Sequence, residues 1–150
     1  MGIYIGGTGA ANLYDDYEEG TFNCSFQTNS GSFPSQSAVG RYTKIGRVVQ
    51  IQGQIFWGAS DGSGSGLLWI TLPFTNTSAT RGGIAPGLVS GLDFDTEHQL
   101  YILPEINSTN CYLLQSKPND PAGGHAHLRP SSLRNYASRA FSFGGTYIVN

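Results

Sequence analysis

Charged side chains are scarce in this chain of 150 residues. Asp, Glu, Lys and Arg together make up 12% of the sequence, about half of the ~25% that is usual in soluble domains. The formal net charge is −2, and 39% of the residues are hydrophobic. This composition disfavours intrinsic disorder, which needs high net charge and few hydrophobic residues. It also disfavours nucleic-acid binding, because the sequence has no basic excess.

Cysteine is nearly absent as well. The two cysteines, Cys24 and Cys111, are too few for a disulfide framework. Each has strand-favouring aromatic neighbours, so we interpret both as buried small hydrophobic residues rather than nucleophiles or metal ligands. No apolar run approaches the ~18 residues of a membrane span, and the N-terminus lacks the basic region of a signal peptide. The length suits one domain with a sizeable core.

The few acidic residues are unevenly distributed. Four of the ten lie in one cluster near the N-terminus: Asp15, Asp16, Glu18 and Glu19. The rest of the chain is therefore close to neutral and rich in hydroxyl and amide groups, which suits uncharged polar partners such as glycans. Crowded carboxylates repel one another unless cations offset them, so we expect some of Arg41, Lys44 and Arg47 to fold back against the cluster. A solvated acidic linker is the alternative.

Alternating hydrophobicity predicts β-strands along most of the chain. Between Val49 and Trp57 the odd-numbered positions are apolar or glycine, and the even-numbered positions are mostly glutamine. Such alternation is typical of a half-buried strand in a sandwich. The Gly46-Arg47 pair just before it predicts a tight hairpin turn. The stretch from Gly58 to Gly66 predicts a flexible surface loop, which the fold should lose without unfolding.

Further short strands follow at intervals of roughly ten residues. They are predicted at Leu67–Leu72, Ile84–Val89, Gln99–Ile106, Asn110–Gln115 and Phe141–Val149. With Gly, Pro, Asn and Ser between them, this spacing predicts an all-β fold, a jelly-roll-like antiparallel β-sandwich. Residues 131–140 are the exception, because Leu133, Tyr136, Ala137 and Ala140 recur at helical spacing behind Pro130 and could form one short helix.

The first twenty residues begin with a short strand pattern that has no evident partner. Gly2-Ile3-Tyr4-Ile5 alternates like a short strand, but no partner strand precedes it. An isolated strand cannot satisfy its own backbone groups. The simplest solution is intermolecular, with the segment paired against other chains.

The order of the motifs along the chain resembles one protein family. The motifs are DDYEEGTF at Asp15–Phe22, RYTKIGRVV at Arg41–Val49, LPFT at Leu72–Thr75 and GTYIV at Gly145–Val149. Together they resemble the distal head of bacteriophage tail fibres and tailspikes, where a junction often written DDYEEGTWTP connects a slender shaft to a β-rich head. Asn23-Cys24 departs from the usual Thr-Pro of that junction. The resemblance spans nearly the whole chain.

The resemblance implies an architecture and a role. It implies a stalk and junction segment at residues 1–20, a β-sandwich head at residues 21–150, a homotrimer and an upstream fibre shaft. It also implies a virion component, made in the host cytoplasm, that is not an enzyme and adheres by binding a host-surface polysaccharide or outer-membrane receptor. The alternative is a trimerisation module that registers an upstream enzymatic or adhesive domain. A depolymerase is disfavoured, because such enzymes usually sit on β-helices too long for this chain.

Carboxylates supply one group of candidate site residues. Asp93, Asp95 and Glu97 recur at every second position, which places them on one face of an extended chain. Paired carboxylates serve glycosidases or, with carbonyl oxygens, bind calcium; a polar loop or edge strand is the alternative. Asp61 lies in a Gly- and Ser-rich loop without enough acidic residues for a metal site. The sequence shows no catalytic triad, phosphate loop or CxxC motif, so we predict no catalytic residue and no cofactor.

Histidines and aromatic residues supply the other candidate site residues. His125 and His127 would point the same way from an extended strand, as metal-binding pairs do in other phage fibres, but the Gly- and Pro-rich segment 118–130 favours exposed loop histidines. Sugar rings stack on Trp and Tyr while polar groups bind their hydroxyls. We therefore predict ligand-binding residues among Trp57, Asp61, Asp93, Asp95, Tyr101 and Tyr112. Trp69 and Tyr147 are predicted to lie in the core.

Overall fold

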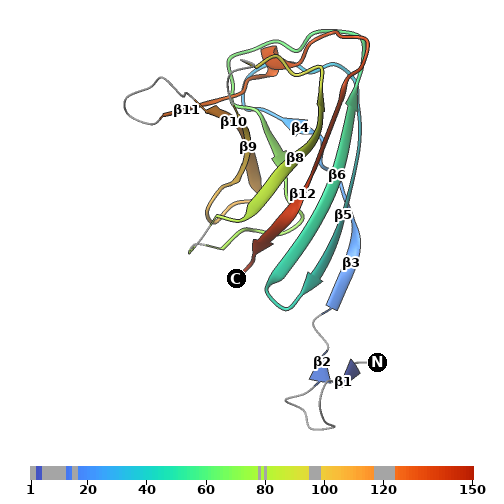
Figure 1. The fold of residues 1–150 in the computed structure, drawn as a ribbon, viewed down its shortest axis with the longest axis vertical. Helices are drawn as coiled ribbons and strands as arrows, with labels where there is room; N and C mark the ends of the chain where they lie inside the picture. The colour runs from blue at the N-terminus through green and yellow to red at the C-terminus, as the bar shows by residue number, and fades with distance from the viewer. Residues whose placement is uncertain are drawn as a thin grey trace.

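A computed structural model gives the fold of the chain (Figure 1). It describes residues 3–4, 13–14, 17–77, 79, 81–94, 99–116 and 124–150. The described part is all-β and antiparallel, as predicted, apart from a 3-10 turn at Pro130–Ser132. It contains no helix with the length and hydropathy to span a bilayer.

Ten strands form one large antiparallel sheet. They are β3 (Tyr17–Phe22), β4 (Phe26–Gln27), β5 (Gln36–Ile45), β6 (Val48–Trp57), β7 (Trp69–Thr71), β8 (Gly83–Ser90), β9 (Leu100–Pro104), β10 (Asn110–Ser116), β11 (His125–His127) and β12 (Ala140–Ile148). Their order is β3-β5-β6-β12-β8-β9-β10-β7-β4, and β11 pairs with β10 outside this path. Five of these strands match the segments predicted after the loop at 58–66, while β4 and β11 were not predicted.

The sheet curls into two layers that enclose the core (Figure 1). β8 pairs with β9 at one position, where Ile84 lies opposite Ile102. On the far side of the curl, Phe26 of β4 packs against Trp57 of β6 and Phe141 of β12, with ring centroids 5.7 Å apart in both pairs. We call β3, β5, β6, β12 and β8 the β6 layer, and β9, β10, β7, β4 and β11 the β10 layer. This arrangement agrees with a β-sandwich; the jelly-roll topology and the trimer stay predictions.

The predicted alternation along β6 is confirmed. Val49, Ile51, Ile55 and Trp57 are buried, whereas the intervening Val48, Gln50, Gln52 and Phe56 are exposed. The hairpin before β6 is also confirmed, because Gly46-Arg47 connects two strands that pair at Ile45 and Val48. Gly46 has a φ of 55°, the left-handed conformation that the tightest hairpin turns require.

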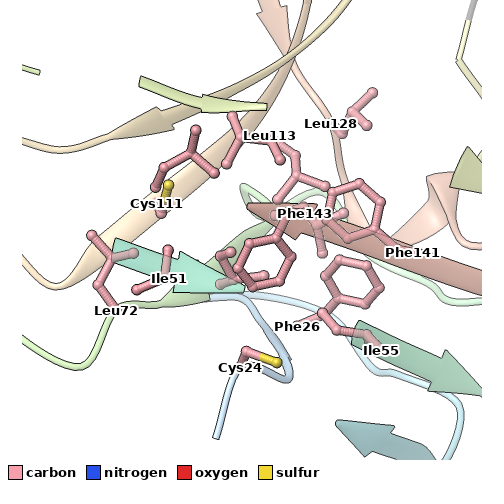
Figure 2. Close-up of a cluster of buried hydrophobic side chains, with 14 of the residues drawn as sticks. Cys24, Phe26, Ile51, Ile55, Leu72, Cys111, Leu113, Leu128, Phe141 and Phe143 are labelled. Atoms are coloured by element: carbon pink, nitrogen blue, oxygen red, sulfur yellow. The ribbon is translucent and has the colours of Figure 1, made fainter. Parts of the chain in front are cut away.

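Both cysteines are buried and free, as predicted (Figure 2). Cys24 and Cys111 are each 0% exposed within the hydrophobic core. Burial raises the pKa of Cys24 to about 11 and raises the pKa of Cys111 further still. Both thiols therefore stay protonated at neutral pH, and they pack as small hydrophobic side chains.

Aromatic rings of the β6 layer lie over glycines on the neighbouring strand. The cross-strand pairs are Gly20–Tyr42, Gly40–Phe22 and Gly53–Phe143. A Cβ at any of these glycines would come closer to the paired ring than van der Waals contact allows. Glycine at these positions therefore makes room for the ring on the core side of the sheet.

We expect Gly53→Ala to lower the free energy of unfolding by about 1–3 kcal/mol, because the added methyl group overlaps the Phe143 ring. Gly144→Ala on adjacent β12 is the matched control, since the nearest atom to its Cβ would be the Ile51 carbonyl oxygen at 3.4 Å. Guanidinium unfolding measures both. Equal destabilisation by the two substitutions would contradict the ring-over-glycine packing.

Two sequence-based expectations about the loops are wrong. Residues 131–140 form no α-helix beyond the 3-10 turn that ends at Ser132, because the backbone around Leu133 is bonded elsewhere: Leu133 bridges to Leu92, and the Arg134 N–H donates to the Gly91 carbonyl. The segment 58–66 is not a free loop either. Gly62 is buried, and its N–H donates to the Leu133 carbonyl at 2.9 Å.

The N-terminal strands also differ from expectation. β1 (Ile3–Tyr4) pairs with β2 (Leu13–Tyr14) in a separate two-stranded sheet, so the expectation that Gly2–Ile5 lacks a partner within the chain is wrong. β3 crosses the predicted domain boundary at residue 20, because it pairs with β5 from Tyr17 to Phe22. The division into stalk and head stays a prediction.

The acidic cluster at positions 15–19 has a cation against it, as expected. The ammonium group of Lys44 lies 3.4 Å from a carboxylate oxygen of Glu18. Arg47 instead donates to the Val149 carbonyl oxygen, at 2.9 Å. Glu19 accepts the Tyr17 hydroxyl at 2.7 Å, and the other two acids of the cluster, Asp15 and Asp16, lie outside the described residues.

Candidate functional site

The outward face of the β10 layer carries a set of aromatic side chains in register. On β10, Cys111 and Leu113 are 0% exposed and point into the core. Side chains alternate along a strand, so Tyr112 between them points outward. Tyr112 is paired with Trp69 of β7, and the next outward residue, Leu114, is paired with His127 of β11. Residues from three strands therefore meet on one face.

We call Trp69, Tyr112, His127 and His125 the aromatic row. The ring centroids of Trp69 and Tyr112 are 5.9 Å apart, and those of Tyr112 and His127 are 5.0 Å apart. His127 and His125 follow at 6.2 Å. All three contacts are edge-to-face, the geometry that aromatic quadrupoles favour. The first three side chains are half-buried and His125 is exposed, so the row is held in place and still reaches solvent.

His127 is the most constrained member of the row. Its Nδ1 is buried and has no hydrogen-bond partner among the described residues. Burial lowers the pKa of His127, and the neighbouring His125 and Arg129 lower it further. The imidazole therefore stays neutral at pH 7 and contacts Tyr112 as an uncharged ring.

The histidine pair lies on a strand rather than in a loop. His125 and His127 pair with Ser116 and Leu114 of β10, so the loop interpretation of segment 118–130 is wrong for these residues. As expected for an extended pair, their rings lie on the same face. Over the described ranges, no group of three or more His, Cys, Asp or Glu side chains is placed to hold a metal ion.

Tyr101 extends the same face toward β9. Its cross-strand partner is Leu114, and its ring is 45% exposed. The hydroxyl donates to the side-chain oxygen of Gln99 at 2.9 Å. Leu114 is 1% exposed although it is not part of the central core cluster, so it is buried on the outer side of the layer. The structure thus brings together two predicted site residues, Tyr101 and Tyr112.

The other predicted site residues lie elsewhere. Trp57 is 5% exposed, and its indole N–H donates to the Arg134 carbonyl at 3.2 Å. Because it is buried, Trp57 is a core residue rather than the ligand contact that the sequence predicted. Asp61 accepts the backbone N–H of Asn135 at 2.6 Å. Asp93 accepts two N–H groups of the Arg134 guanidinium, at 2.8 and 2.7 Å. Asp95 lies outside the described residues.

Sequence reasoning missed part of the aromatic row. Tyr147 is 1% exposed, as predicted for a core residue, but Trp69 is half-buried and faces outward. The neighbouring Ile70 is 0% exposed, so the alternation in β7 carried the signal for Trp69. The spacing of His125 and His127 did mark them as a same-face pair, but the contact of His127 with Tyr112 was not predicted, because β11 has only three residues and its pairing with β10 was not recognised.

Comparison with known proteins bears on the fold. No family model matches the chain, and no curated protein matches it. Among solved structures, a crystal structure of the Dettilon tailspike protein is similar, with a TM-score of 0.69 and 22% sequence identity over 89% of this chain. The fold is similar to that of part of this tailspike. The match covers 24% of the Dettilon chain, so the present chain corresponds to a fraction of that protein. The likeness does not test the DDYEEGT junction.

Proposed function

We propose that this chain is a distal C-terminal module of a phage tail fibre or tailspike that binds a host-surface glycan without catalysis. The observation that carries the proposal is the aromatic row, whose half-buried rings are fixed by edge-to-face contacts. The similarity of the fold to part of the Dettilon tailspike supports the assignment to such a particle. The proposal includes a homotrimer on the virion tail, an upstream shaft, and a surface polysaccharide or outer-membrane glycan as partner.

The chemistry of the row suits an uncharged sugar. Pyranose rings present C–H faces that stack on Trp and Tyr, and rigid aromatic side chains lose little conformational entropy on binding. His127 is neutral at pH 7, which keeps the centre of the row uncharged. Amide and hydroxyl groups at Gln99 and Ser116 lie beside the row at the ends of β9 and β10 and supply partners for sugar hydroxyls.

The described carboxylates favour binding over hydrolysis. A glycosidase needs two carboxyl groups facing one another across the scissile bond. Asp93 is engaged with Arg134, and Asp61 caps the backbone at Asn135. Asp93 lines a hollow beside His127, and no second Asp or Glu is among the described residues that line it.

A second function, assembly, is favoured by a different surface. Large apolar side chains are exposed on the outer face of the β6 layer: Val39 at 54%, Phe56 at 48%, and Ile45 and Val48 at 45% each. They form two separate groups on the β5–β6 hairpin, Ile45 with Val48 at the turn and Val39 with Phe56 toward the other end, and each group offers apolar area for association. A chain that trimerises through this face and registers an upstream domain would be a trimer in light scattering and would bind no glycan.

We expect Tyr112→Ala to weaken glycan binding about tenfold or more, because it removes the ring that contacts both Trp69 and His127. A glycan array probed with labelled protein identifies the ligand, and isothermal titration with the best-binding oligosaccharide measures the change. Tyr136→Ala is the matched control, since Tyr136 is 53% exposed and lies outside the row. Unchanged affinity in Tyr112→Ala, or equal losses in both variants, would contradict the proposed site.

A further inference from the structure

A pocket of about 690 Å³ opens where β8 and β9 separate. The two strands share one registered pair, Ile84 and Ile102, so the sheet leaves space beside it. The volume falls within the ~300–1,000 Å³ range of small-molecule sites. The pocket is lined by residues from β8, β9, β10 and β11, and four strands therefore hold its shape.

The lining of this pocket is mainly apolar. Among its lining residues, Ile84, Ile102 and Leu114 are each at most 7% exposed, whereas Ala85, Tyr101 and His125 are exposed. Among the described residues that line it, none is Asp, Glu, Lys or Arg. Transfer of an uncharged apolar group from water into such a site is favourable, whereas transfer of a charged group is unfavourable because the group loses its hydration.

The pocket is continuous with the aromatic row. His125 belongs to both, since its ring contacts His127 and its side chain lines the pocket. Leu114 lines the pocket and is paired with Tyr101 on one side and His127 on the other. A saccharide stacked on the row can therefore place one substituent in the pocket without leaving the surface.

We propose that the β8–β9 pocket takes the methyl group of an N-acetyl sugar or of a 6-deoxy sugar, and so selects these neutral saccharides over their counterparts that lack the methyl group. This inference rests on the proposed glycan binding and specifies its ligand class. The substituent supplies the apolar group that fits beside Ile102 and Leu114, and the sugar ring remains at the mouth. There Tyr101, His125 and Ser116 offer polar groups to its hydroxyls.

Two pairs of sugars test the inference on the full chain. N-acetylglucosamine is compared with glucose, and L-rhamnose with L-mannose, each at millimolar concentration. Saturation-transfer NMR should give the strongest signal at the acetyl or C6 methyl protons. Amide shifts should appear at Ala85, Tyr101 and Ser116, and each methyl-bearing sugar should bind about tenfold more tightly than its partner, the lower end of the discrimination that an apolar pocket achieves for a methyl group over a hydroxyl.

A variant whose added side chain fills the pocket provides a second test of the inference. A Cβ on Gly83, which lines the pocket, would meet no atom within 4 Å, so Gly83→Phe should occupy the space without displacing the core. We expect this variant to lose the preference for substituted sugars and to keep a dispersed amide spectrum. Ser37→Phe, on the exposed face of β5, is the control for an added aromatic ring. Ala85→Leu fills the same pocket if Gly83→Phe does not fold.

The outcomes separate the two proposals. Equal binding of substituted and unsubstituted sugars, with amide shifts confined to the aromatic row, overturns the pocket inference and leaves the proposed function standing. Unchanged preference in both filled variants also overturns the pocket inference. If no sugar in the NMR series and no glycan on the array binds the unsubstituted protein, the proposed function itself fails, and the pocket inference fails with it.

Discussion

Deleting residues 59–65 and joining Gly58 to Gly66 should destabilise the fold by about 4 kcal/mol. Four hydrogen bonds anchor this segment to distant backbone: two between Ser32 and Ser63, one from Gly62 to Leu133, and one from Asn135 to the Asp61 carboxylate. At roughly 1 kcal/mol each, their loss is a large fraction of the ~5–15 kcal/mol that stabilises a typical domain. The sequence had predicted that the fold tolerates this deletion.

A point substitution tests the same packing without changing the loop length. A Cβ on Gly62 would overlap the Pro130 carbonyl group, so Gly62→Val should destabilise the protein strongly. Ala59→Val is the control, because Ala59 is exposed in the same segment. Thermal unfolding followed by circular dichroism measures all three variants. A deletion variant as stable as the parent would mean that the segment contributes nothing to the fold.

The second large effect is expected at the centre of the core. Ile55→Ala should lower the free energy of unfolding by about 2–5 kcal/mol, because Ile55 is 0% exposed and lies between Ala38 and Phe141 in the sheet. Gln52→Ala, on the exposed face of the same strand, should change it by less than about 0.5 kcal/mol. Denaturant unfolding at low protein concentration gives both values. Comparable losses would show that the glutamine face is covered as well, as it would be against another subunit.

The strands were predictable because their signal is local. Each strand of the β6 layer is long, and β6 alternates apolar and polar side chains over ten residues, so the sequence carries several repeats of the pattern. The Gly46-Arg47 turn was predictable for the same reason, since Gly46 occupies a conformation that favours glycine. Short strands such as β4 and β11, with two and three residues, hold too few repeats to be recognised.

The candidate site was predictable only in part. Tyr101 and Tyr112 were identified as aromatic residues on strands with polar neighbours, and they lie on one face. Trp57 carried the same features in the sequence and is buried. What separates them is the opposite layer, because the ring of Phe26 in β4 packs against Trp57. No residue pattern near Trp57 predicts a contact with a strand so much earlier in the chain.

The sequence by itself determined the all-β class, the inward and outward faces of β6, the turn that precedes it, and the burial of both cysteines. These properties depend on the period of side chains along one strand and on the conformations of single residues. The tertiary structure alone decided that residues 58–66 are anchored, that residues 131–140 are not helical, and that Trp69, Tyr112 and His127 form a row. The physical reason is that these features arise from hydrogen bonds and ring contacts between segments far apart in the chain, whose register is set only when the sheet curls and closes.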